Sequence, residues 1–467
     1  MKKRHPRGLY LLFATELWER FSYYSMRTLL VLYLTLGLGQ SKEEALSILA
    51  IYSGLVYLTP LIGGFLADRY LDQANAIVTG GILMFLGHVL MSFPTLFFWA
   101  TALLIAGNGF FKPSISILVG RLYPPDDPRR DSAFAIFYMG INLGAFLAPI
   151  VSGYLGEVFG WHYGFAAAAI GMLMGLIIFL GFHGRYLAHF PLAPLKIALF
   201  VALAFVVIAA VKLLLLLWGW QPLLCGLVLM LGLGWLFYRH ATLPTLTSAE
   251  KNRFKTLLGF APFVIIFWLA FEQMGGILIL FIRERVDHHW FGLEIPTTAF
   301  LATNPLVIII FAPILAWLWQ KKPFCWLSPL AKAALGLLWL ALGFVMIFLA
   351  RLFAENGLVS PWWVFLAYFL ITIGELCLSP TSLALVAQLA PQRFASLSMG
   401  GFFLLTAIGS FAANQMAALF VERELLLYGT LATLAFLAGL LLFGLSRKIY
   451  GFSQGDKRKE ELPLIPL

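Results

Sequence analysis

Several ionisable residues lie inside the first long apolar segment of the chain. Glu16, Glu19 and Arg20 fall in the run ELWERFSYYSMR, and Arg27 follows two helical turns later. A charged side chain at the centre of a bilayer costs about 2.5–3.5 kcal/mol on insertion scales. Glu16, Glu19 and Arg20 have the spacing i, i+3, i+4 and therefore share one face of a helix. Such a charged face is typical of a polar path through a membrane protein.

Three further ionisable residues lie deep in later apolar segments: Lys112, Glu272 and Glu375. The whole set holds four carboxylates and three cations, so one carboxylate lacks a cationic partner. Because desolvation disfavours its charged form, such a carboxylate readily takes up a proton. We predict that Glu16, Glu19 or Glu272 is protonated and deprotonated during turnover. The alternative is that all these charges form internal salt bridges that only hold helices together.

The composition identifies an integral membrane protein. Of the 467 residues, 61% are hydrophobic and 12% charged, with a mean hydropathy of +0.89. Soluble domains carry about 25% charged residues. Long apolar runs without alternation predict an all-α protein and argue against a barrel. We attribute the net charge of +10 to cytoplasmic loops and expect no nucleic-acid partner. The three cysteines have no paired spacing, so we expect neither a disulfide nor a metal site.

Apolar stretches of about 20 residues predict about fourteen membrane-spanning helices. They fall near residues 8–38, 43–70, 74–93, 97–123, 131–158, 161–183, 193–217, 221–239, 254–284, 296–320, 328–351, 361–390, 393–421 and 424–446. An even number of spans places both termini on one side of the membrane. Lys and Arg are concentrated in the loops of that side, which predicts that both termini are cytoplasmic.

A weak internal repeat divides the chain into two halves. The same spacing occurs in Gly107, Pro113 and Pro124 and in Gly374, Pro380 and Pro391. A second match lies nearer the start of each half, where Pro60 is eight residues before Asp68-Arg69 and Pro313 is eight residues before Lys321-Lys322. Two repeated six-helix bundles with a binding site near the midplane are a known transporter architecture. We predict an N-terminal bundle over residues 1–190, an inserted transmembrane hairpin and linker over 191–245, a C-terminal bundle over 246–450 and a cytoplasmic tail over 451–467.

Polar side chains in the apolar segments surround the charged positions. They are Tyr23, Tyr24, Tyr57, Asn142, Asn304 and Ser379. Each supplies a hydrogen-bonding group on a buried surface, as a solute site requires. The alternative is that they join helices to one another within the bilayer.

Several motifs, in order along the chain, resemble those of the proton-dependent oligopeptide transporters of the major facilitator superfamily. ELWERFSYYSMR resembles the ExxERFxYY motif, and GGFLADR resembles the cytoplasmic loop motif of the superfamily. GNGFFKPSISILVGRLY and RRDSAFAIFYMGINLGAFLAP resemble the long family signature. FWLAFEQ, NPLVIIIFAP and GELCLSPTS resemble the later motifs. The resemblance covers nearly the whole chain, including an extra helix pair common in bacterial members.

The resemblance implies uptake of di- and tripeptides with protons, by alternating access. It implies that proton and peptide are coupled by Glu16, Glu19 and Arg20. The peptide carboxylate would be held by Arg27 and Lys112, and its ammonium group by Glu375 with the help of Asn142 and Asn304. The resemblance also implies that the site is lined by Tyr23, Tyr24 and Tyr57, and that Glu272 is both a gate partner of Arg27 and a proton site. Many relatives have Trp where this chain has Phe402, so one specificity pocket is expected to differ.

We therefore expect a transporter and not an enzyme. It would lie in the bacterial inner membrane, act as a monomer and need no cofactor beyond the proton gradient. Two rival interpretations are a family member that moves another small solute, such as nitrate or a peptide-like compound, and a membrane-embedded enzyme. Glu375, as a partner for an ammonium group, argues against nitrate. The enzyme would need a nucleophile–base or metal cluster, and the sequence contains no such motif.

Overall fold

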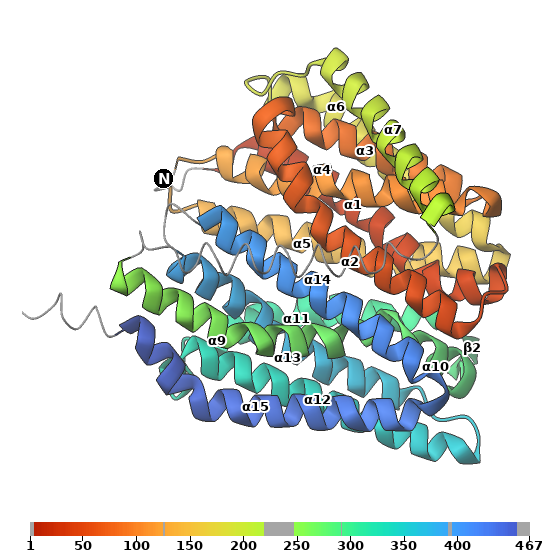
Figure 1. The fold of residues 1–467 in the computed structure, drawn as a ribbon, viewed down its shortest axis with the longest axis vertical. Helices are drawn as coiled ribbons and strands as arrows, with labels where there is room; N and C mark the ends of the chain where they lie inside the picture. Colours follow the sequence, from red (N-terminus) through yellow and green to blue (C-terminus); the bar gives the residue numbers. More distant parts are fainter. Residues whose placement is uncertain (1–3, 125–126, 219–246, 291, 391–394, 455–467) are drawn as a thin grey trace, which may run out of the picture. The chain divides into compact units, whose positions relative to one another are not determined.

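A computed structural model describes residues 4–124, 127–218, 247–290, 292–390 and 395–454 (Figure 1). The described chain forms two compact units. The first unit joins Met1–Pro222 to Met274–Ile309, and the second joins Leu223–Gln273 to Ile310–Leu467. The domain boundaries expected at residues 190, 245 and 450 stay a prediction.

The first unit is built mainly from long helices that follow one another with short connections. They are α1 (Arg7–Leu32), α2 (Lys42–Leu66), α3 (Gln73–Met91), α4 (Phe97–Arg121), α5 (Arg130–Ala148), α6 (Trp161–Tyr186) and α7 (Pro194–Trp218). The short helix α10 (Ile277–Arg285) joins this unit from later in the chain. Four π-helical segments extend three of the long helices: Tyr33–Gly37 after α1, Ala67–Leu71 after α2, and Pro149–Gly153 and Leu155–Phe159 after α5. A capping box formed by Ser41 and Glu44 begins α2, because each side chain binds the other residue's backbone N–H.

Glycine allows the helices of the first unit to approach closely. A Cβ atom on Gly63 of α2 would overlap the carbonyl group of Gly109 of α4. A Cβ atom on Gly107 of α4 would lie only 2.7 Å from the carbonyl oxygen of Gly80 in α3. Small residues at such contacts are typical of helix packing in membranes. The glycines therefore bring α2, α3 and α4 into direct backbone contact.

The second unit contains the later helices. They are α9 (Ser248–Phe271), most of α11 (Thr303–Leu318), α12 (Pro329–Phe353), α13 (Trp362–Leu389), α14 (Ala395–Leu419) and α15 (Glu424–Gln454). Helix α12 packs against both α13 and α15 (Figure 1). A Cβ atom on Gly336 of α12 would lie 2.7 Å from the carbonyl oxygen of Gly374 in α13, which repeats the contact between Gly80 and Gly107.

The predicted span near 254–284 is interrupted in the structure. Helix α9 ends at Phe271, a 3-10 segment covers Glu272–Gly275, and α10 begins at Ile277. After α10, strands β1 (His289–Trp290) and β2 (Leu293–Glu294) pair antiparallel, with His289 opposite Glu294. The His289 backbone N–H donates to Asp287 Oδ1 at 2.9 Å and holds the pKa of Asp287 below its usual value. A 3-10 helix over Thr297–Ala302 then leads into α11.

Twelve helices within the described residues are long and apolar enough to cross a membrane. Helix α1 is also long enough at 26 residues, but it carries the buried charges. Helix α7 is the first half of the predicted inserted pair, and the second half near 221–239 lies outside the described residues. Apart from the two short strands, the regular secondary structure of the described chain is helical, which confirms the predicted all-α membrane fold.

A buried charge cluster and candidate solute site

The three charged residues near the middle of α1 form one buried cluster. Glu16, Glu19 and Arg20 are each no more than 3% exposed. Arg20 Nη2 donates to Glu19 Oε1 at 2.7 Å, and Arg20 Nε donates to Glu19 Oε2. Arg20 Nε also lies 3.1 Å from Glu16 Oε1. The shared helix face predicted from the sequence is therefore a compact arrangement with one guanidinium between two carboxylates.

The two carboxylates differ in how fully they are hydrogen-bonded. Both oxygens of Glu19 accept from Arg20. Glu16 contacts Arg20 through Oε1, whereas its buried Oε2 accepts no hydrogen bond from the described residues. Hydrogen bonds to the charged form of a carboxyl group favour that form. Glu16 therefore has the less fully hydrogen-bonded carboxylate.

Close packing by α5 and α6 buries this cluster. A Cβ atom on Gly144 of α5 would overlap the backbone of α1 at Leu17 and would lie 3.0 Å from Arg20 Cβ. On the α6 side, a Cβ atom on Gly175 would lie 3.3 Å from Trp18 Cβ and 3.4 Å from the Thr15 carbonyl oxygen. Because both neighbouring helices approach through glycine, water is kept away from the charges of α1.

Aromatic rings and a second cation lie near the cluster. The Arg20 guanidinium lies 5.0 Å from the centre of the Tyr23 ring, and Tyr23 meets Tyr24 edge to face at 5.2 Å. Lys112 Nζ on α4 lies 4.8 Å from the centre of the Tyr57 ring on α2. Electrostatic interactions connect Lys112 with both glutamates of α1 and with Arg20 and Arg27. The first unit thus brings together most of the predicted site residues of its own helices.

The other predicted site residues of the first unit lie in α1, α5 and α11. Arg27 is half-buried, and a Cβ atom on Gly275 would lie 3.7 Å from its Nε. Asn142 is buried and donates from Nδ2 to the Tyr138 carbonyl oxygen one turn earlier, at 2.9 Å. Asn304 is half-buried in the first turn of α11.

The second unit holds the remaining predicted residues. Glu272 is 1% exposed and begins the 3-10 segment that interrupts the predicted span. Next to it, Gln273 Nε2 donates to the Ala413 carbonyl oxygen in α14 at 2.8 Å. Glu375 and Ser379 are half-buried in α13, and Phe402 is buried in α14. By unit, the first contains two of the predicted carboxylates and all three cations, and the second contains the other two carboxylates.

Sequence analysis missed some buried polar residues near these positions. Ser22 Oγ and His88 Nε2 lie 2.8 Å apart, and both residues are fully buried. Tyr52 is 3% exposed and interacts electrostatically with Tyr23 and Arg27. Asn108 on α4 is buried, and its amide group forms no hydrogen bond with the described residues. Asn108 could have been found from its place inside GNGFFK, whereas the Ser22–His88 contact depends on how α1 packs against α3.

Buried ionisable residues on membrane-length helices define a membrane transport protein, and comparison with known proteins agrees. Residues 74–218 and 238–431 match the model of the POT family. The chain is 38% identical to an uncharacterized transporter from Bacillus subtilis, over 95% of this chain and 94% of that protein. It is 37% identical to a peptide transporter from Yersinia enterocolitica, over 88% and 87% of the two chains.

Solved structures agree with these matches. A crystal structure of a peptide transporter variant in complex with alafosfalin superposes with a TM-score of 0.86 at 36% identity, covering 96% of each chain. The chain belongs to the POT family, and its fold is of the major facilitator type. This confirms the family resemblance and the fold class predicted from the sequence. No group of three or more His, Cys, Asp or Glu residues that could hold a metal ion occurs in the described parts of the chain.

Proposed function

We propose that this chain is a proton-coupled symporter that imports di- and tripeptides by alternating access. The observation that carries the proposal is the buried cluster of Glu16, Glu19 and Arg20, with Lys112 in electrostatic contact. Such charges inside a membrane protein mark ion and substrate pathways. Membership of the POT family and the peptide transporters among its relatives support the same substrate class.

Proton coupling follows from the environment of Arg20. When Glu16 takes up a proton, its attraction to Arg20 weakens, whereas Glu19 remains bound to the guanidinium. The rearrangement of Arg20 changes the field at Lys112, because both cations belong to the same electrostatic cluster. A proton on α1 can thereby change how strongly Lys112 attracts an anionic group.

Peptide recognition rests on charges that suit the two ends of a peptide. Lys112 and Arg27 would hold the carboxylate, and Glu375 would hold the ammonium group. Contacts of this kind use groups that all di- and tripeptides share, so they accept many side chains. The remaining features of the proposal are a bacterial inner-membrane location with both termini cytoplasmic, a monomer as the working form, no cofactor and no catalytic activity.

The proposal is tested with the purified chain in proteoliposomes, by uptake of labelled dialanine with and without an inward pH gradient. Removing one member of a charge pair formed in a binding site costs about 2–5 kcal/mol, so Lys112→Ala and Glu375→Ala should each weaken proton-driven uptake at least about tenfold. Lys212→Ala is the matched control, because Lys212 lies on α7 against the Trp99 ring.

Unchanged uptake by both Lys112→Ala and Glu375→Ala would contradict the site assignment. Uptake that is independent of the pH gradient would contradict proton coupling. Uptake of nitrate in place of dialanine would favour the rival substrate.

A further inference from the structure

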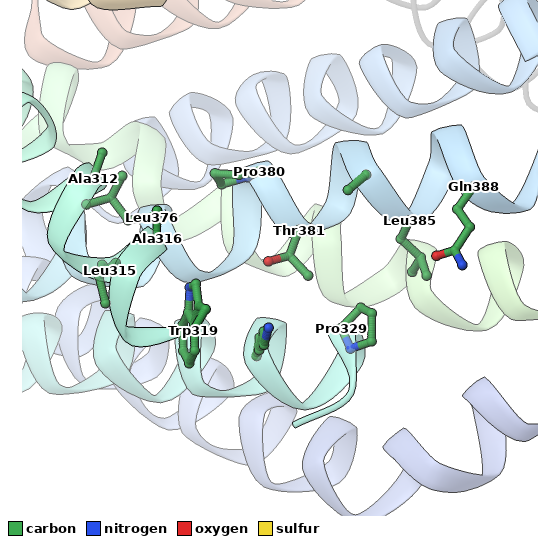
Figure 2. A pocket seen from close by; sticks show the side chains of 12 residues that line it. Ala312, Leu315, Ala316, Trp319, Pro329, Leu376, Pro380, Thr381, Leu385 and Gln388 are labelled. Atoms are coloured by element: carbon green, nitrogen blue, oxygen red, sulfur yellow. The ribbon is translucent and has the colours of Figure 1, made fainter. Parts of the chain in front are cut away.

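A cavity of about 320 Å³ lies among α11, α12 and α13, wholly within the second unit (Figure 2). Its lining combines apolar residues with a few polar ones. Leu376 lines it near the middle of α13, and Leu315 lines it from the last turn of α11. Lys332 lies in the first turn of α12, and Gln388 lies one residue before the end of α13. The cavity is therefore amphipathic, with its polar groups where α12 begins and α13 ends.

The internal repeat explains why this cavity exists. When the two halves are aligned so that Pro60 matches Pro313, Ala316 stands at the position of Gly63. When they are aligned so that Gly107 matches Gly374, Leu376 stands at the position of Gly109. In the first unit, Gly63 and Gly109 bring α2 and α4 into backbone contact. Ala316 and Leu376 both line the cavity. Larger side chains at these two positions keep α11 from approaching α13 as closely as α2 approaches α4.

A cation takes the place of a small residue at the polar end. The contact between Gly80 and Gly107 in the first unit matches the contact between Gly336 and Gly374 in the second. Aligning Gly80 with Gly336 puts Lys332 at the position of Ala76, which is fully buried. Lys332 Nζ lies 4.9 Å from the centre of the Trp319 ring, and no described carboxylate forms an ion pair with it. Lys332 is thus a cation at a cavity whose described lining residues include no acidic side chain.

Two more lysines follow α11, and each lies beside an exposed tryptophan. Lys321 Nζ lies 5.3 Å from the centre of the Trp317 ring, and Lys322 Nζ lies 5.5 Å from the centre of the Trp326 ring. Trp317 is 58% exposed and Trp326 is 72% exposed. Tryptophan and lysine together are typical of the level of the lipid headgroups. These residues place the polar end of the cavity beside the headgroup region.

We propose that this cavity binds one anionic phospholipid of the surrounding membrane. Lys332 holds the headgroup phosphate, Thr381 and Gln388 offer polar contacts, and an acyl chain lies along Leu315 and Leu376. Basic pockets between transmembrane helices on the cytoplasmic side bind anionic headgroups. A zwitterionic peptide does not suit the site, because its ammonium group would find no carboxylate among the described residues of the lining. The inference does not depend on the transported substrate.

Native mass spectrometry of the full-length chain in detergent tests this site. The affinity of the tightest-bound lipid is measured with phosphatidylglycerol and with phosphatidylcholine, and inorganic phosphate is the competitor. The intact chain should retain phosphatidylglycerol in preference to phosphatidylcholine, and phosphate should not displace it. Lys332→Ala should bind phosphatidylglycerol about fivefold more weakly, as expected for one lysine beside an anionic surface.

Two further variants separate lipid binding from misfolding. Lys212→Ala removes a lysine that packs against a tryptophan outside the cavity and should bind lipid like the intact chain. Ala384→Phe fills the cavity and keeps Lys332, so it should also weaken lipid binding. Dialanine uptake and the size-exclusion profile check that each variant is folded.

Three results would overturn the proposal. They are equal affinity of Lys332→Ala and the intact chain, equal retention of the two lipids, and displacement of phosphatidylglycerol by inorganic phosphate or by dialanine. The last would assign the cavity to a free anion or to the transported solute.

Discussion

At the scale of single residues, the two glutamates on the charged face of α1 bind Arg20 differently, Glu19 through both oxygens and Glu16 through one. The spacing of Glu16, Glu19 and Arg20 required a shared face, and the structure has it. Side-chain rotamers and packing against α5 decide which carboxylate binds Arg20 through both oxygens. The spacing of residues along a helix gives no information about either. The structure distinguishes Glu16 by its buried Oε2, which accepts no hydrogen bond from the described residues.

This difference makes Glu16→Gln the sharper test of proton coupling. Glutamine keeps the size of the side chain but cannot take up a proton at neutral pH. We expect at least about a tenfold loss of gradient-driven dialanine accumulation, equivalent to ~1.4 kcal/mol of lost coupling. Exchange of labelled for unlabelled dialanine without a gradient should continue, because that reaction needs no net proton movement.

Glu19→Gln is the comparison for that experiment. It disturbs a carboxylate that binds Arg20 through both oxygens, so both accumulation and exchange should fall. Normal accumulation by Glu16→Gln would instead assign the proton to Glu19 or Glu272.

At the scale of helices, most bounds follow from apolar length and the breaks between segments. The span predicted near 361–390 is α13 at Trp362–Leu389, and the span near 161–183 is α6 at Trp161–Tyr186. The interruption at Glu272–Gly275 was missed, because the flanking residues remain apolar and an apolar run does not distinguish one long helix from two short ones. The direct contact of Gly63 with Gly109 was also missed, since glycine in a sequence does not name its partner.

Two adjacent glycines of α2 provide a matched test of this packing. A Cβ atom on Gly63 would overlap the Gly109 carbonyl group, whereas one on Gly64 would lie 3.5 Å from the nearest atom, in Pro113. We expect Gly63→Ala to destabilise the protein by about 1–3 kcal/mol, the usual cost of overpacking. Gly64→Ala should be neutral or slightly stabilising. Thermal unfolding of the purified variants in detergent measures both, and equal midpoints would contradict the close approach of α2 and α4.

At the scale of the whole molecule, charge pairing strengthens the orientation predicted from Lys and Arg. The few cations expected on the outer side are largely paired. Lys42 Nζ lies 2.7 Å from Glu284 Oε1, Arg351 Nε lies 2.7 Å from Glu424 Oε2, and Arg283 Nη1 lies 3.9 Å from Glu157 Oε2. On the side of the termini, Arg129 and Lys196 lie near Asp127 and Asp72, but the two lysines that follow α11 lie against tryptophan rings. This asymmetry supports a cytoplasmic location for both termini.

Reporter insertions test this orientation. Gly292 lies in the exposed turn between β1 and β2, and His189 lies in the loop between α6 and α7. Alkaline phosphatase, which is active only outside the cytoplasm because it needs disulfides, should be active when inserted at Gly292 and inactive at His189. A fluorescent protein fused to the C-terminus should mature and fluoresce. The reverse pattern at the two insertion sites would mean that the lysine-rich loops face outward, and it would place the polar end of the amphipathic cavity in the outer leaflet.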